Sequence, residues 1–406
     1  MAEDPAYLRK GMTMRKKLVF WENAVETLGY FSHELADHFM ENGYECFFVD
    51  HKNAKSTIEQ LSRWVEPGNT VFITFNFIGL SGEPECMGQT QRIWEEWKAD
   101  CICIMVDHPF YYYKQLHDKA NERVKLFCVD RGHVAYVHRF YPQADCGFLP
   151  LAGNKSRQDV PWVPYKKRNY DISLIANFVP LEDLEIHLNN QPEEYVEFYR
   201  EIIGDLKAHP AQMVDEVLER YILREIPEAT DTDICSAEAG MIAIDLYIRS
   251  LYRIAVINAL TDAGLRVHVF GRGWSKCPVQ HRENLISNGK MLTSAQCVEI
   301  IRNSKIALNI MPWFKDGAHD RIFTAMLNGA VSLTDDSRYL REILTDGEDV
   351  CFYELTDLTE IAKKAEYLLA HEEKAETIIK HAYQTADRAH TWKERAKQLE
   401  HFCTET

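Results

Sequence analysis

Short apolar runs and amphipathic stretches alternate along the first part of the chain. The apolar runs that predict strands lie at 18–21, 45–50, 70–77, 101–107, 124–130 and 146–151. The stretches with helical spacing lie at 25–42, 54–66, 88–97 and 131–140. Apolar strands that alternate with helices are typical of a parallel sheet covered on both faces. We therefore predict a doubly wound α/β domain in residues 1–153.

A second domain of the same type is predicted beyond a polar linker at 154–169, which contains two prolines. Its predicted strands are 170–178, 266–271, 305–311, 331–335 and 349–354. Its predicted helices are 243–263, 294–303, 321–330, 337–344 and 357–388. Residues 181–240 show helical spacing without a strand and are interpreted as a helical insertion in this domain, which spans 170–388. The amphipathic helix in 389–406 is expected to pack back on the first domain.

Composition and charge narrow the class of protein. The chain has 406 residues, 46% apolar and 27% charged, which suits a globular protein of two domains. Its formal net charge of −16 argues against nucleic acid as the main partner. No apolar run approaches 18 residues, so neither a signal peptide nor a transmembrane segment is expected. The eleven cysteines include no CxxC pair, which predicts reduced thiols in a cytoplasmic protein.

Two doubly wound domains that face each other enclose a cleft at the carboxyl ends of their strands, where ligands bind. The loop and helix start within 309–339 are the richest segment at this edge and hold Gly317, His319, Asp320 and Arg321. Free N–H groups at a helix start favour an anion, and a guanidinium adds a fixed positive fork, so the pattern suits a diphosphate. An ordinary capped helix with Arg321 in a surface ion pair is the alternative.

The segment 317–340, GAHDRIFTAMLNGAVSLTDDSRYL, resembles the C-terminal signature of the CgeB/spore-maturation-type glycosyltransferases. The matching positions are Gly317, Arg321, Phe323, Gly329, Thr334 and Asp335. YDISLIANF, VHVFGRGW, VDHPF, FLPLAG and the tail from 346 resemble further stretches of the family in the same order. The resemblance covers most of the chain apart from 181–240. It implies a GT-B fold and a bacterial glycosyltransferase of hexosyltransferase type that uses a nucleoside diphosphate sugar.

The resemblance also implies a donor site in the second domain. The implied donor-binding residues are Asn177, Gly271, Arg272, Gly273, Trp274, Asn309, Gly317, His319, Thr324, Asp335 and Ser337, with Arg321 also given a catalytic role. Thr324 stands where related GT-B enzymes have a ribose-binding Glu, and Asp316 stands where many have another Glu. A hydroxyl binds ribose more weakly than a carboxylate does. The glycines of 271–274 suit either a phosphate or a plain tight turn, and Trp274 either a base or the core.

The acceptor side is assigned to the first domain. Asp107 and His108 follow a buried strand and are the candidates for the base that deprotonates an acceptor hydroxyl. The alternative is a turn set by Pro109 with His108 at the surface. Trp21, Glu22 and Asn23 follow the first strand and are expected to line the cleft on the acceptor side.

The predicted activity is transfer of a sugar to a hydroxyl of a glycan or protein. No cofactor and no metal are expected, because no HxH, HExxH or DxD motif stands in a clear context. Asp335 and Asp336 are the candidate metal ligands, although capping of helix 337–344 explains them better. Two other functions remain open, a sugar-nucleotide epimerase and a non-catalytic nucleotide-sugar-binding relative. The sugar, the base of the nucleotide, the stereochemistry and the oligomeric state are left undetermined.

Overall fold

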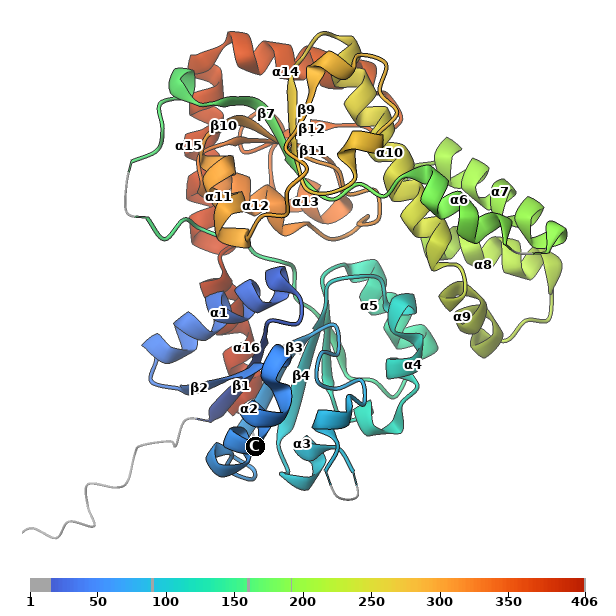
Figure 1. Ribbon diagram of the computed structural model, residues 1–406, viewed down its shortest axis with the longest axis vertical. Coiled ribbons are helices and arrows are strands. Elements are labelled where there is room, and N and C mark those ends of the chain that lie inside the picture. Colours follow the sequence, from blue (N-terminus) through green and yellow to red (C-terminus); the bar gives the residue numbers. More distant parts are fainter. Residues whose placement is uncertain (1–15, 89–90, 159–160, 191, 405–406) are drawn as a thin grey trace, which may run out of the picture.

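The computed structural model describes residues 16–88, 91–158, 161–190 and 192–404. They form two α/β domains, one above the other in Figure 1, and a group of helices that projects from the second domain. Residues 1–15 of the first predicted domain, parts of the predicted linker and the last two residues of the predicted C-terminal helix lie outside the described residues.

The N-terminal domain is a six-stranded parallel sheet in the order β2-β1-β3-β4-β5-β6. Its strands are β1 (Lys17–Glu22), β2 (Glu45–Asp50), β3 (Thr70–Phe75), β4 (Asp100–Met105), β5 (Lys125–Cys128) and β6 (Cys146–Phe148). Its helices are α1 (Glu26–Glu41), α2 (Ala54–Trp64), α3 (Ile93–Glu96), α4 (Tyr113–Leu116) and α5 (Arg131–Phe140). In the register of the sheet, Val19 lies between Phe47 and Phe72. Strand order reverses beside β1 and β3, which makes the ends of these strands a switch point.

The C-terminal domain contains a second six-stranded parallel sheet in the order β12-β11-β10-β7-β8-β9. Its strands are β7 (Tyr170–Ile175), β8 (Val267–Phe270), β9 (Leu285–Ser287), β10 (Ser304–Asn309), β11 (Val331–Asp335) and β12 (Cys351–Tyr353). Its helices are α10 (Ile242–Asp262), α11 (Ser294–Arg302), α12 (Asp320–Leu327), α13 (Arg338–Ile343), α14 (Thr359–Ala370) and α15 (Glu372–Ala389). The reversal of strand order here falls between β7 and β10.

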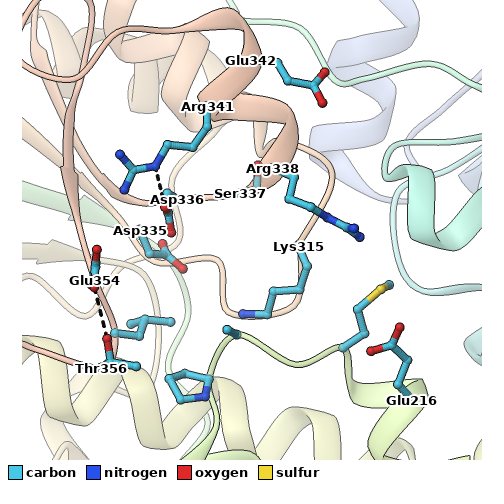
Figure 2. A pocket seen from close by; sticks show the side chains of 14 residues that line it. Glu216, Lys315, Asp335, Asp336, Ser337, Arg338, Arg341, Glu342, Glu354 and Thr356 are labelled. Carbon is cyan, nitrogen blue, oxygen red and sulfur yellow. Dashed lines mark hydrogen bonds and ion pairs between the residues drawn. The ribbon is translucent and has the colours of Figure 1, made fainter.

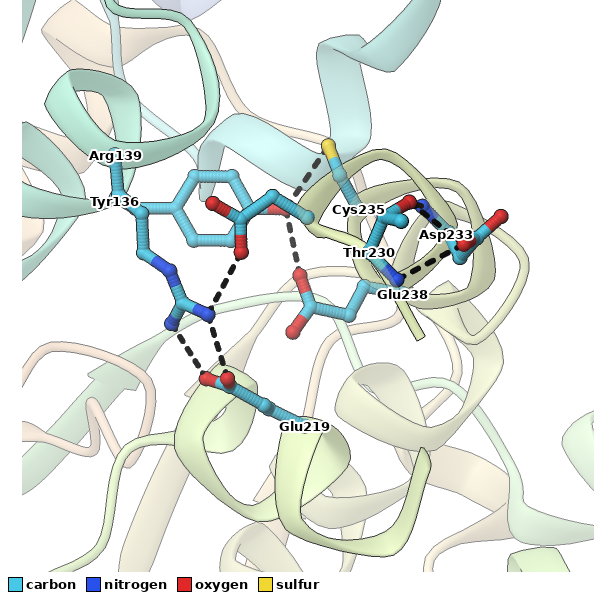
Figure 3. A network of polar contacts seen from close by, with 8 residues as sticks. Tyr136, Arg139, Glu219, Thr230, Asp233, Cys235 and Glu238 are labelled. Atoms are coloured by element: carbon cyan, nitrogen blue, oxygen red, sulfur yellow. Dashed lines mark hydrogen bonds and ion pairs between the residues drawn. The ribbon is translucent and has the colours of Figure 1, made fainter. Parts of the chain in front are cut away.

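The predicted helical insertion consists of four helices, α6 (Leu181–Asn189), α7 (Glu193–Ala208), α8 (Val214–Glu225) and α9 (Asp231–Ala239). Two of them, α8 and α9, contact the N-terminal domain. The Tyr136 hydroxyl on α5 donates to Glu238 on α9 at 2.6 Å, and Arg139 pairs with Glu219 of α8 (Figure 3). The insertion therefore joins the two domains through buried and half-buried polar contacts.

The C-terminal helix α16 (Trp392–Thr404) runs from the second domain down to the first (Figure 1). Its Trp392 ring packs against Phe31 of α1 at a centroid distance of 4.5 Å, and Tyr44 donates to Glu400. The Trp392 indole N–H donates to the side chain of Asn154, at the start of the segment that we predicted as a linker. The described start of that segment is thus packed between the domains.

Three local predictions need correction. The predicted helix 357–388 is two helices, because His371 has non-helical φ and ψ of −119° and 75°. The predicted helix 88–97 is reduced to the single turn of α3, and part of its range lies outside the described residues. Strand β9 was not predicted, because its two apolar residues, Leu285 and Ile286, stand alone between polar residues.

Candidate functional site

A cavity of about 540 Å³ lies between the domains, where the switch points of both sheets meet. Asn76 follows β3 and Asp107 follows β4 on the side of the N-terminal domain. The opposite side is lined by Trp313 after β10 and, at the end of β7, by residues 175–177 and Val179. Apolar side chains of α1 and α11, including Leu28 and Val298, complete the wall. We refer to this cavity as the cleft.

Three guanidinium groups from the C-terminal domain converge on the cleft. Arg249 and Arg253 stand four residues apart on α10, and Arg321 belongs to the first turn of α12. Arg249 pairs with Asp245 at 2.6 Å and stacks on Trp313 at 4.3 Å. Arg253 also lies over Trp313, at 5.6 Å, but makes no hydrogen bond or ion pair with the described residues.

Arg253 lies close to the positive charges of Arg249 and Arg321. Burial, together with Arg321 and Arg249, lowers the pKa of Arg253 to about 9, so the group remains charged at neutral pH. Like charges held close together in a half-buried place are unfavourable unless an anion joins them. The cleft is therefore electrostatically suited to an anionic ligand group such as a diphosphate.

Local structure holds Arg321 in place. His319 caps α12, and its Nδ1 accepts hydrogen bonds from the main-chain N–H and the Nε of Arg321. One Nη of Arg321 donates to the carbonyl of Ile175 at 2.7 Å, which leaves its remaining N–H groups for a ligand. Burial and the charge of Arg321 lower the pKa of His319, although Asp320, whose Oδ1 lies 2.6 Å from His319 Nδ1, acts in the opposite direction. Burial alone would raise the pKa of Asp320, but His319 and Arg321 bring it below its usual value.

Asp107 faces these cations from the other domain. Its carboxylate accepts from Asn76 Nδ2 at 3.2 Å and from the Tyr112 hydroxyl at 3.3 Å, and lies 3.7 Å from Arg249. The side chain is 34% exposed, so a ligand in the cleft can reach it. The Asn76 backbone has a left-handed φ of 51°. Its side-chain oxygen accepts a hydrogen bond from the Val106 N–H, which holds the side chain in place.

The interpretation of His108 as a candidate base is wrong. Its side chain is buried and stacks on Phe110 at 4.1 Å, and its Nε2 faces Asp215 of the insertion at 3.4 Å. The neighbouring His133 is also buried, and burial and His108 lower its pKa to about 4. The alternative with His108 at the surface is equally wrong, because the imidazole lies in the contact with the insertion.

The turn 271–274 is structural. Gly271 and Gly273 have φ of 135° and 85°, and a Cβ at these positions would lie 2.3 Å from the Ala176 carbonyl and 1.9 Å from that of Phe178. Trp274 is fully buried and donates its indole N–H to the Ala176 carbonyl, so it cannot stack on a base.

Two of the predicted donor residues lie beside this turn. Asn177 lines the cleft, and its side chain accepts from the main-chain N–H of Arg272. The Arg272 side chain is exposed and lies outside the cleft lining.

Several other predicted donor residues make contacts that support the fold. Thr324 lines the cleft, but its hydroxyl already donates to the Asp320 carbonyl and accepts from the Asn154 N–H. Gly317 lies against the N-terminal domain, where an added Cβ would be 2.4 Å from the Val129 carbonyl. Asn309 is buried and donates to Thr334 beneath the sheet edge. These contacts explain the residues as parts of the fold.

Asp335 and Ser337 line a different cavity on the far side of the loop that joins β10 to α12. Ser337 caps α13, accepting from the Leu340 N–H, and donates to the Gly317 carbonyl at 2.6 Å. Asp316 also faces the domain contact, where its N–H donates to Asp130 at 2.8 Å. Among the described residues, no group of three or more His, Cys, Asp or Glu side chains is arranged to hold a metal ion.

The predicted acceptor-side residues lie apart from the cleft. Trp21 is 4% exposed and packs beneath Gly79, whose φ is +80° and whose added Cβ would lie 1.9 Å from the indole. Glu22 pairs with His33, and Asn23 donates to Asp50. Trp21 is therefore a core residue, and the other two lie at the carboxyl end of β1, where their side chains bond within the N-terminal domain.

Sequence reasoning missed Asn76, Arg249 and Arg253. A signal for the two arginines was available, because they share one face of a helix that is otherwise mainly apolar. Asn76 carried no comparable signal, since a single polar residue after a strand is common.

Comparisons with known proteins agree with this architecture. Residues 252–401, rather less than half of the chain, match a family model described as glycosyl transferase-like. No curated protein matches the chain. Among the helices in the part of the chain that the structure describes, none has the length and apolar character needed to cross a bilayer.

Solved structures share the fold at low sequence identity. An α-glucosyltransferase (AGT) in complex with UDP aligns with a TM-score of 0.56 and 8% identity, over 96% of this chain and all of that chain. Sucrose-phosphate synthase from Thermosynechococcus elongatus aligns at 0.53 and 10% identity, over 96% of this chain and 98% of that chain. The alignment with S. aureus TarM, at 0.48 and 11% identity, covers 87% of this chain and 59% of that chain. The predicted GT-B fold, with two doubly wound domains, is thus confirmed.

Proposed function

We propose that the protein is a glycosyltransferase that moves a sugar from a nucleoside diphosphate sugar to an acceptor hydroxyl. The observation that carries the proposal is the group of three guanidiniums at the cleft, in which Arg253 has no counter-ion among the described residues. A diphosphate supplies the missing negative charge, and planar guanidiniums bind phosphate oxygens in pairs.

The comparisons support this proposal. The glycosyl transferase-like match at 252–401 includes Arg253 and Arg321. The α-glucosyltransferase that shares the fold is described in complex with UDP, and in another structure with UDP and DNA. A net charge of −16 makes a polyanionic acceptor unfavourable here, so we propose a glycan or protein hydroxyl as the acceptor.

In the proposed mechanism, Arg253 and Arg321 hold the diphosphate, and the N–H groups at the start of α12 assist them. Negative charge grows on the diphosphate as the glycosidic bond breaks, so these groups stabilise the transition state more than the bound donor. Asp107 stands on the opposite wall and accepts the proton of the acceptor hydroxyl. The walls from two domains limit the access of water and so limit donor hydrolysis.

A nucleotide panel tests the proposal. UDP, GDP, ADP and dTDP, and the corresponding sugar nucleotides, are added at millimolar concentration while the melting temperature is measured. A ligand that binds only the folded protein raises the melting temperature. Failure of every nucleotide to do so would contradict the proposal. Binding without hydrolysis or transfer would indicate a non-catalytic binder, and conversion of the donor to an epimer would indicate an epimerase.

A further inference from the structure

A second cavity of about 800 Å³ lies between the helical insertion and the C-terminal domain (Figure 2). One wall is formed by residues 210–216, where α8 begins, and the others by the loops that follow β11 and β12. The loop from β10 to α12 separates this cavity from the cleft, since Trp313 lines the cleft and Lys315 lines the second cavity. We call it the insertion cavity.

Two polar groups in the insertion cavity lack partners. Asp335 is 2% exposed, and its Oδ1 accepts from the Met311 N–H at 2.8 Å. Its Oδ2 has no hydrogen bond with any described residue. The Lys315 ammonium likewise makes no hydrogen bond or ion pair within the described ranges, and Figure 2 shows both groups turned toward the same space. Burial raises the pKa of Asp335 to about 7 and lowers that of Lys315.

An unpaired buried polar group costs folding free energy that a ligand can return by supplying the missing hydrogen bond. Here a donor and an acceptor stand on neighbouring walls, too far apart to pair directly. A ligand that offers both an acceptor and a donor within a short distance satisfies both groups. Adjacent hydroxyl groups have this property, because each hydroxyl both donates and accepts.

The rim of the cavity favours an uncharged ligand. Arg341 is neutralised by Asp336 at 2.6 Å, and the exposed Arg338 lies 3.8 Å from Asp316. Glu216 on the insertion and Glu354 after β12 supply further negative charge. Positive and negative groups therefore alternate around the opening. Their combined electrostatic potential attracts neither a polyanion nor a polycation strongly.

We propose that the insertion cavity is a carbohydrate-binding site, separate from the cleft, in which Lys315 and Asp335 hold hydroxyl groups of a neutral oligosaccharide. The role of the bound chain rests on the proposed function, since such a site would keep a glycan acceptor on the enzyme. The binding itself requires neither the donor nor the cleft.

Ligand-observed NMR tests the proposal at neutral pH without nucleotide, with maltohexaose, cellohexaose and N-acetylchitohexaose as probes. We expect at least one of them to bind the parent protein at millimolar concentration or below. Lys315→Met and Asp335→Asn should each weaken that binding about tenfold or more, because each removes one charge-assisted hydrogen bond. The exposed Lys363→Met variant is the matched control and should bind like the parent.

Other results would overturn the proposal. The first is that no probe binds. The second is that binding is lost in Arg321→Ala but kept in Lys315→Met. The third is that inorganic phosphate binds in a Lys315-dependent way while no sugar binds. If Asp335→Asn does not fold, Glu216→Gln at the rim takes its place beside Lys315→Met. Nucleotide affinity is measured in parallel, so a protein that binds oligosaccharide through Lys315 but no nucleotide refutes the proposed function alone.

Discussion

Replacement of Arg253 by Met tests whether this guanidinium binds a ligand or stabilises the folded protein. The guanidinium has no hydrogen-bond or ion-pair partner among the described residues, and burial with the neighbouring Arg321 and Arg249 lowers its pKa to about 9. At about 1.4 kcal/mol per pKa unit, this shift corresponds to an upper bound of about 5 kcal/mol of unfavourable charge burial. Met keeps an apolar side chain beside Trp313. Because solvent in the open cleft screens the charge of Arg253, we expect the free energy of unfolding of the variant to rise by only about 1–2 kcal/mol.

The same change should weaken nucleotide binding. Loss of a charge-assisted hydrogen bond costs about 1.5–3 kcal/mol, or about 10- to 150-fold in the dissociation constant. Arg321→Ala is the informative comparison, because its guanidinium bonds to Ile175 and His319 and its loss should not stabilise the protein. Calorimetric titration of UDP and thermal melts without nucleotide measure the two effects. An Arg253→Met variant that binds UDP like the parent, or that melts lower without nucleotide, refutes the assignment.

Three further predictions concern the base, an insertion contact and metal. Asp107→Asn should reduce turnover about 10²- to 10⁴-fold without weakening UDP binding, and equal turnover would remove Asp107 as the base. Burial raises the pKa of Glu238 to about 8, so the folded state binds more protons than the unfolded state from its ordinary pKa up to about 8. The free energy of unfolding should therefore fall as pH rises through this window, by up to about 1.4 kcal/mol per unit, and denaturant titrations should show a flatter profile for Glu238→Gln. Transfer should survive EDTA, whereas loss restored by manganese would refute metal independence.

Much of the fold was predictable because both sheets are parallel and buried. Strand β2 and helix α5 occupy the predicted ranges, since an apolar run and an amphipathic stretch each end at a polar residue or turn. Strand β9 escaped prediction, because its two apolar residues stand alone between polar residues, whereas the equally short β6 and β12 lie in longer apolar runs. Boundaries such as the break at His371 depend on tertiary contacts that local periodicity does not record.

The candidate site was only partly predictable. Arg321 and Asp107 do line the cleft, because each follows a strand end at the meeting edge of the sheets. Thr324 also lines the cleft, but its hydroxyl accepts from a main-chain N–H 170 residues away, a contact that the sequence does not reveal. The roles predicted for Trp274 and His108 fail because both side chains are buried. A residue next to a strand end can point into the core or into another domain, and the sequence does not distinguish these directions.

The helical insertion helps to hold the walls of the cleft in place. Asp215 on α8 faces His108, the residue directly after Asp107, and Tyr111 beside it donates to Asp245 on α10 at 2.7 Å. Asp245 in turn pairs with Arg249, the guanidinium that lies nearest to the Asp107 carboxylate. The distance across the cleft between the Asp107 carboxylate and the Arg249 guanidinium is therefore fixed by contacts that the insertion and α10 make with the N-terminal domain. Since the start of α8 also walls the insertion cavity, the two cavities share one supporting element.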